Sequence, residues 1–105
     1  MEKLQAERTR LAKTLLRMTK EEIKKQLPNW FDGEVYEIGD EVRNPYSGET
    51  ALLDAAELSM YDAVKGAEMV MLMGFGNIDE CVDVINQGKD WFLARNPQAY
   101  MTLLD

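Results

Sequence analysis

The chain has 105 residues, of which 46% are hydrophobic and 30% are charged, a balance that excludes a wholly disordered or collagen-like protein. It carries 12 basic and 19 acidic residues, for a net charge of −7, with one cysteine and no histidine. These counts exclude a disulfide scaffold, a catalytic unit that needs histidine, and a metal site built from His and Cys within one chain.

The length fits a single domain over residues 1–105. A chain this short buries only about 60–65% of its unfolded surface, so a monomer is marginally stable. It also carries seven methionines and nine aromatic residues, which is more apolar material than one small core needs. We therefore expect a homodimer.

Residues 1–27 are predicted to form a basic helical arm. Leu4, Leu11 and Leu15 recur at helical spacing and predict a helix over residues 2–18. Residues 1–26 hold eight basic and four acidic residues, whereas residues 27–105 hold four basic and fifteen acidic ones. The chain is therefore electrically polarised along its length.

A second, short helix is predicted over residues 20–27. Thr19 and Glu22 have the spacing of a capping box, in which each residue satisfies a backbone amide of the other. Ile23 and Leu27 would face inward, and Pro28 ends the helix.

Residues 28–50 form a turn-rich, aromatic insert. Gly39 and Asp40 are typical of a two-residue turn, which predicts a small hairpin of roughly residues 35–38 with 41–44. Residues 44–48 read as a separate turn around Pro45. Aromatic residues and arginine are enriched at protein interfaces, and the residues predicted here to bind a partner are Trp30, Phe31, Tyr36, Arg43 and Tyr46.

Residues 51–105 are predicted to be the helical core. Asp54 and Glu57 form a second capping box that begins a central helix over about 54–74, which the glycines at 74 and 76 end. Its apolar arc is so wide that we expect it to be nearly surrounded by the rest of the protein. An amphipathic helix follows over about 78–95. Asn96 and Pro97 then begin a short fourth helix whose Tyr100, Leu103 and Leu104 fold back.

The predicted fold is therefore mainly α: a small bundle of about four helices, with an insert that holds a short β-hairpin. No segment approaches the ~18 apolar residues of a membrane span, so no membrane contact is predicted. The charged start of the chain lacks the apolar stretch of a secretory signal. A single cysteine without such a signal favours a cytoplasmic location.

Enzymatic chemistry has little support in the sequence. Ser47, Ser59 and Cys81 have no imidazole to act as their base, and Cys81 lies on an apolar helix face. Carboxylate pairs such as Asp79 with Asp83 could hold a divalent ion, but nineteen acids place such pairs together by chance. No phosphate loop, EF-hand or dinucleotide fingerprint is present. We therefore expect no enzyme, no cofactor and no metal.

Binding to nucleic acid is a second alternative, because the basic arm could lie along phosphates. The residues that would do so are Arg8, Arg10, Lys13 and Arg17. The strongly acidic remainder of the chain repels the same polyanion. Pairing of the arm with that acidic remainder, either in its own chain or in a symmetry mate, is therefore the favoured interpretation. Conversely, acids on several faces could imitate DNA and bind a nucleic-acid enzyme.

Three stretches of the sequence stand out: Val-Arg-Asn-Pro-Tyr-Ser-Gly-Glu at 42–49, Glu-Leu-Ser-Met-Tyr-Asp at 57–62 with Gly66, and the ending from Asp90 to Asp105. Together they resemble small uncharacterised proteins of tailed bacteriophages, including marine ones. The resemblance spans about residues 42–105 and implies a phage-type origin and a host cytoplasm. It brings no activity or site. The favoured function is a non-enzymatic protein–protein interaction or accessory protein of phage type.

Overall fold

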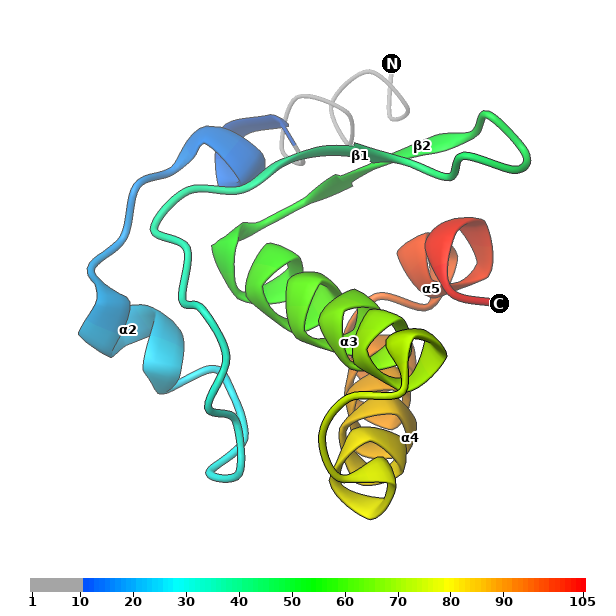
Figure 1. Cartoon of the computed structure of the whole chain (residues 1–105). Coiled ribbons are helices and arrows are strands. Elements are labelled where there is room, and N and C mark those ends of the chain that lie inside the picture. Colours follow the sequence, from blue (N-terminus) through cyan, green and yellow to red (C-terminus); the bar gives the residue numbers. More distant parts are fainter. Residues whose placement is uncertain (1–10) are drawn as a thin grey trace.

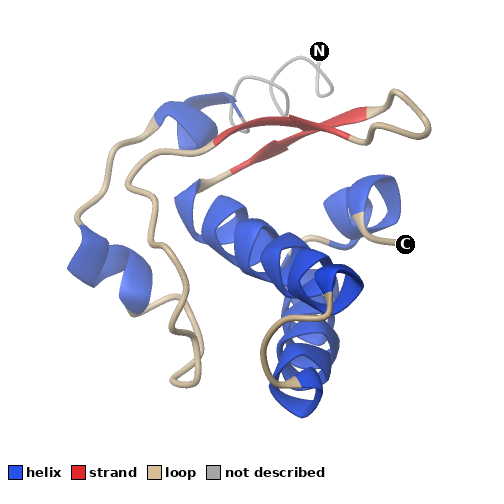
Figure 2. Ribbon diagram, viewed as in Figure 1, coloured by secondary structure: helices blue, strands red, loops and turns tan. Residues whose placement is uncertain are grey.

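The structure is a computed structural model that describes residues 11–105 (Figure 1). It is mostly helical and contains one small antiparallel hairpin, as the sequence predicts (Figure 2). In chain order the elements are α2 (Lys20–Lys24), β1 (Asp40–Arg43), β2 (Thr50–Leu53), α3 (Ala55–Met73), α4 (Ile78–Arg95) and α5 (Pro97–Leu103). No helix in residues 11–105 has the length and apolar character needed to cross a membrane.

The central helix α3 has the predicted boundaries because both of its ends are set by local chemistry. The Asp54 side chain accepts a hydrogen bond from the Glu57 amide at 2.8 Å, and the Glu57 carboxylate accepts one from the Asp54 amide at 3.0 Å. These bonds satisfy two of the amides that a helix start leaves unpaired. At the other end Gly74 takes a left-handed conformation, with φ of 75°, which ends the helix.

Helices α4 and α5 also begin where their caps predict. Asn77 accepts from the Glu80 amide at 3.2 Å, and Asn96 accepts from the Ala99 amide at 3.1 Å. Pro97 occupies the first turn of α5, where its missing N–H costs nothing. The last residues of the chain fold back as predicted, and Leu103 and Leu104 are buried in the core.

Helices α3 and α4 cross closely at Gly88 of α4. A Cβ atom at this position would lie 2.5 Å from Cγ2 of Val64 and 3.2 Å from Sδ of Met60. The side chains of Val64, Met60 and Phe92 are fully buried around this crossing. The core then continues beneath the hairpin, α2 and α5, through Ile23, Leu27, Leu53, Ala55, Ala56, Ala99, Leu103 and Leu104.

The hairpin contains one of the two predicted strands but pairs it with a different partner, since β1 lies within one residue of the predicted 41–44. β1 pairs antiparallel with β2, from Asp40 opposite Leu53 to Arg43 opposite Thr50, so the prediction of residues 35–38 with 41–44 is wrong. The reversal is made by residues 44–49: the Asn44 side chain accepts from the Tyr46 amide at 2.8 Å, and Gly48 has a φ of 79°. The first strand is therefore followed by the turn predicted at 44–48, and the second strand extends past the predicted end of the insert at residue 50.

Gly39 has a different role from the predicted turn. It is buried, and a Cβ atom there would lie only 2.0 Å from the backbone oxygen of Leu53. Its amide donates to the backbone oxygen of Thr14 at 2.8 Å. The glycine thus allows three segments of backbone to meet, which explains its presence without a reversal of the chain.

The N-terminal arm differs in part from its prediction. Of the helix predicted over 2–18, residues 1–10 lie outside the described residues, residues 11–15 are helical and residues 16–19 are not. The helix cannot run through because Thr19 caps α2, accepting from the Glu22 amide with an extended ψ of 154°. Helix α2 ends at Lys24 instead of Leu27, although Ile23 and Leu27 are both buried as predicted.

The arm is docked on the rest of the protein. Thr14 is buried, and the Met18 amide donates to the backbone oxygen of Glu37 at 2.9 Å. Together with the bond from Gly39 to Thr14, this contact places residues 14–18 beside residues 37–39, just before β1.

Candidate functional site

Among residues 11–105, half of the exposed large apolar side chains lie where α3 turns into α4. We call this surface the tip; it comprises Met69, Met71, Leu72, Met73, Phe75, Ile78 and Val82, whose side chains are all exposed. Leu72 keeps 89% of its surface in contact with solvent and Phe75 keeps 64%. In Figure 1 the tip lies at the lower end of the two long helices, where green passes into yellow.

The exposure of the tip corrects one prediction about α3. The whole helix is predicted to be nearly surrounded, yet its buried residues lie between Ala55 and Val64. Beyond Val64 the helix extends past the core, so its apolar residues continue into solvent. An exposed apolar surface of this kind is typical of a site that binds another molecule.

The turn between α3 and α4 holds Phe75 outward. Gly74 and Gly76 both have positive φ, 75° and 74°, a conformation that residues with a side chain rarely adopt. The amides of Gly74 and Phe75 donate to the backbone oxygens of Met71 and Val70, at 3.1 and 3.2 Å. The hydrogen-bonded turn thus presents an aromatic side chain at the end of the molecule.

The charges around the tip are mainly acidic. Residues 66–88 contain four acids, Glu68, Asp79, Glu80 and Asp83, and no base. The two lysines that flank this range, Lys65 and Lys89, both form ion pairs with Glu68, at 3.3 and 3.9 Å. An apolar surface with acidic surroundings favours a ligand that is apolar and basic.

An open groove of about 440 Å³ adjoins the tip on α4. Trp30 and Asp32 line one side of it, and Glu80 and Asp83 of α4 lie on the other. The remaining lining residues are Ala67, Cys81, Val84 and Gln87. The groove therefore combines one large aromatic side chain with three carboxylates and holds no base.

The five residues predicted to bind a partner do not form one surface. Trp30 and Phe31 lie side by side with ring centroids 6.5 Å apart and are half-buried against the core. Arg43 and Tyr46 lie instead at the turn of the hairpin, where Tyr46 is 96% exposed. Figure 1 shows this turn at the opposite side of the molecule from residues 30–36. Among the five, only Trp30 lines the groove.

Tyr36, the fifth predicted residue, is tied to α3. Its amide donates to Oγ of Ser59 at 3.0 Å, and its phenol makes a hydrogen bond with the Asp62 carboxylate. Partial burial, the negative charge of Asp62 and that of Glu34 raise the pKa of the Tyr36 phenol above its usual value. The residue therefore attaches the insert to the central helix.

The residues predicted to contact nucleic acid lie partly outside the structure. Arg8 and Arg10 belong to the part of the chain that is not described. Arg17 pairs with Glu37 at 3.7 Å, and its side chain is largely exposed. Lys13 lines a small cavity whose other charged residues are Asp54, Glu57 and Arg95. In the described part, these two bases thus lie near acids of their own chain.

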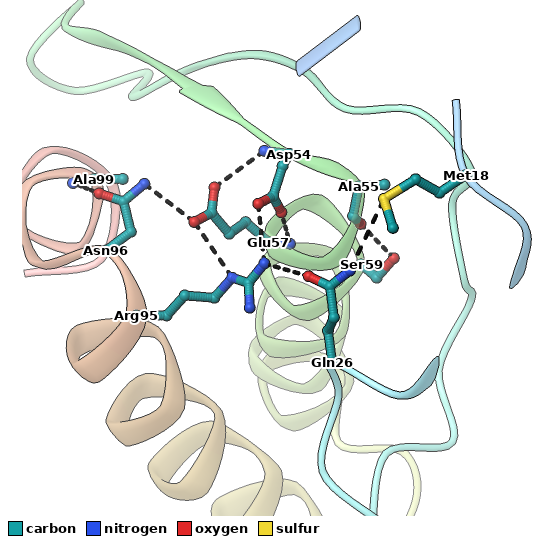
Figure 3. A network of polar contacts seen from close by, with 9 residues as sticks. All are labelled: Met18, Gln26, Asp54, Ala55, Glu57, Ser59, Arg95, Asn96 and Ala99. Carbon is teal, nitrogen blue, oxygen red and sulfur yellow. Dashed lines mark hydrogen bonds and ion pairs between the residues drawn. The ribbon is translucent and has the colours of Figure 1, made fainter. Parts of the chain in front are cut away.

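A polar junction joins α3, α4 and α5 (Figure 3). The Arg95 guanidinium lies 3.0 Å from the Asp54 carboxylate and 3.5 Å from that of Glu57, and it donates to the Gln26 side chain. The Asn96 amide donates to Glu57 at 3.3 Å. Glu57 is only 7% exposed, and this burial raises the pKa of its carboxyl, while Arg95 and Asn96 act in the opposite direction.

The junction is an arrangement for holding helices together. Each charged side chain in it has an opposite charge or a hydrogen-bond donor at contact distance, so its groups are engaged with one another. Within residues 11–105, no three Cys, Asp or Glu side chains are grouped so that they could hold a metal ion.

A comparison of the chain with known protein families, with curated proteins and with solved structures finds no match in any of the three. The resemblance to phage proteins therefore stays a prediction.

The tip is the part of the site that sequence reasoning missed. Its residues are prominent in the sequence as the apolar run from Met69 to Met73 and as the sequence Gly-Phe-Gly that follows. Helical periodicity identifies an apolar face but does not say whether the face packs inside the protein or against another molecule. The absence of any base between residues 66 and 88 is the signal that could have distinguished this part of the helix from the core.

Proposed function

We propose that this protein is a non-enzymatic protein-binding module whose tip and groove receive a basic, amphipathic segment of a partner. The observation that carries the proposal is the exposure of five large apolar side chains at the end of α3: Met69, Met71, Leu72, Met73 and Phe75. Burying such side chains contributes about 1.5–3 kcal/mol each, which leaves a strong drive toward association.

The composition of the tip supports a protein as partner. Methionine side chains are flexible and adapt to irregular apolar surfaces, and three of the seven tip residues are methionines. The acids around the tip disfavour nucleic acid and anionic lipid head groups, since both carry negative charge. A segment with leucine-like side chains and lysine or arginine satisfies both properties of the site.

The groove supplies the second part of the proposed interface. Trp30 offers an aromatic surface of the kind that dominates binding energy at interfaces. Asp32, Glu80 and Asp83 lie around it, so a lysine or arginine of the partner could reach a carboxylate there while its stem lies on the indole. The proposed site thus retains Trp30 and places the other contacts on the tip.

A photo-crosslinking amino acid placed at Leu72 tests the proposal in cells that make the protein. The control places it at Met101, which is also exposed but lies on α5. We expect a crosslinked protein from position 72 and none from position 101. Products from a third position, Tyr46, without products from 72 would support the hairpin turn instead. The absence of protein products from all three positions would refute the proposed function.

A further inference from the structure

We infer that the partner of the tip is a second copy of this chain, which contributes its residues 11–20. This inference rests on the proposed function of the tip and names its occupant. We call residues 11–20 the basic segment. It carries Lys13, Arg17 and Lys20 and no acid, so its net charge is +3.

The basic segment has the two properties that the tip requires. Leu11, Leu15 and Leu16 are each about half exposed or more, which leaves a second group of large apolar side chains uncovered in the described structure. Leu11 and Leu15 are four residues apart in a helical stretch and therefore share a face. The exposed leucines match the apolar tip, and the bases among them match its four acids.

The outward presentation of these leucines is compatible with the docked position of the segment. Thr14 faces inward and is buried, and Met18 is half-buried beside Glu37. The segment is thus held by one face to its own chain while the face with Leu15 is open. A partner can bind it without removing any core residue.

The basic segment cannot reach the tip of its own chain. In Figure 1 residues 11–16, drawn in blue, lie at the top of the molecule, and the tip lies at the bottom, with the core between them. Depth in the view can only add to this separation. Because the two complementary surfaces lie at separate places on one molecule, the basic segment of one copy can bind the tip of a second copy.

A pair of chains can make this contact twice. If the two copies are related by a twofold axis, the segment of each covers the tip of the other, and the assembly closes as a dimer. If the axis does not close the pair, the same contact extends into longer assemblies. The twofold arrangement buries two tips at once and would stabilise a chain that is too short to bury much surface alone.

Light scattering after size-exclusion chromatography, with two variants and a matched control, tests the inference. Leu72→Asp places a charge on the tip, and Leu15→Asp places one on the basic segment. The control, Met101→Asp, places a charge at an exposed position of α5. We expect the wild type and Met101→Asp to be dimers. Each of the other two variants should lower the association constant at least tenfold. Raising the salt from about 50 mM to about 500 mM should also weaken the dimer.

Mixing the two variants distinguishes this contact from other dimers. The Leu72→Asp chain keeps an intact segment and the Leu15→Asp chain keeps an intact tip, so an equimolar mixture should form a heterodimer through one remaining contact. Circular dichroism of each variant shows that the fold survives. A second segment variant, Lys20→Glu, changes charge without touching an apolar residue and should reduce the salt dependence.

Two results would overturn the inference, and only the second leaves the proposed function standing. If Leu72→Asp is monomeric while Leu15→Asp stays dimeric, the dimer forms between two tips, and the proposal of a basic partner segment fails with the inference. If the wild type is monomeric at every concentration that its solubility allows, yet position 72 crosslinks to a different protein in cells, the tip binds another partner. A monomer without any crosslinked product would refute both statements.

Discussion

The close crossing of α3 and α4 predicts opposite effects for two glycine-to-alanine substitutions. In Gly88→Ala the new methyl group would lie 2.5 Å from Cγ2 of Val64 and 3.2 Å from Sδ of Met60. The methionine end can move aside, but the branched valine has one strongly preferred rotamer in a helix. Gly66 lies at an exposed position of α3, and in Gly66→Ala the new methyl group would meet no atom within 4 Å.

The expected magnitudes follow from two competing terms. Replacing glycine by alanine inside a helix stabilises a protein by about 0.5–1 kcal/mol. Overpacking a core costs about 1–3 kcal/mol. Gly88→Ala should therefore lower the free energy of unfolding by up to about 2.5 kcal/mol, whereas Gly66→Ala should raise it by about 0.5–1 kcal/mol. For a domain of this size each kcal/mol shifts the melting temperature by about 4–8 °C.

Urea unfolding followed by circular dichroism measures both substitutions. A double variant that combines Gly88→Ala with Val64→Ala identifies the clashing atom, because removing the valine methyl groups makes room for the new one. Its loss of stability should be smaller than the sum of the two single losses. An increase in stability for Gly88→Ala, similar to that for Gly66→Ala, would show that the two helices do not approach at this position.

Three further predictions concern the polar contacts. Burial raises the pKa of the Glu57 carboxyl, so the contribution of this group to stability is most favourable below the usual carboxyl pKa and declines as pH rises through the raised pKa. The free energy of unfolding of Glu57→Gln, measured beside that of the wild type from pH 4 to 7, should therefore increase relative to the wild type as pH rises. Arg95→Met removes the cation beside Asp54 and the buried Glu57, which should cost about 1–3 kcal/mol in urea unfolding. Lys89→Met is the control: it removes a half-buried base of α4 whose only ion pair among the described residues is the 3.9 Å contact with the half-buried Glu68, and it should change stability by less than about 0.5 kcal/mol. Asn44→Ala loses both the turn bonds and a 2.9 Å bond from its amide to the backbone oxygen of Thr102, so the melting temperature should fall by about 4–8 °C, and an unchanged value would contradict the contact with α5.

The parts of the fold that could be predicted from the sequence are those that depend on neighbouring residues. The capping contacts of Asp54, Asn77 and Asn96 each span three residues, so the types and spacing of the residues were enough to place the starts of α3, α4 and α5. The same holds for the start of α2, which the capping box of Thr19 and Glu22 predicts, although the prediction of helix up to residue 18 is wrong for residues 16–18.

The parts that could not be predicted depend on distant residues. The prediction gives the strand at 41–44 the wrong partner because Gly39 and Asp40 together are typical of a turn, whereas the position of Gly39 is determined by Leu53 and Thr14. The exposure of the tip is not predicted, for a related reason. Leu72 and Met73 continue the apolar face of α3, and their exposure becomes evident only when the structure shows that α3 extends beyond the core of the protein.

Arg95 has a consequence for the kinetics of folding. Its guanidinium joins Gln26, which is 69 residues away, and Asp54, which is 41 residues away, whereas the hairpin and the α3–α4 turn join near neighbours. Closing long loops costs chain entropy, so we expect the local pairs to form before the transition state and the Arg95 contacts to form after it. Substitutions at Arg95 should then accelerate unfolding and leave the refolding rate nearly unchanged. Arg95 would therefore determine the lifetime of the native state, through the unfolding rate, more than the rate at which the native state forms.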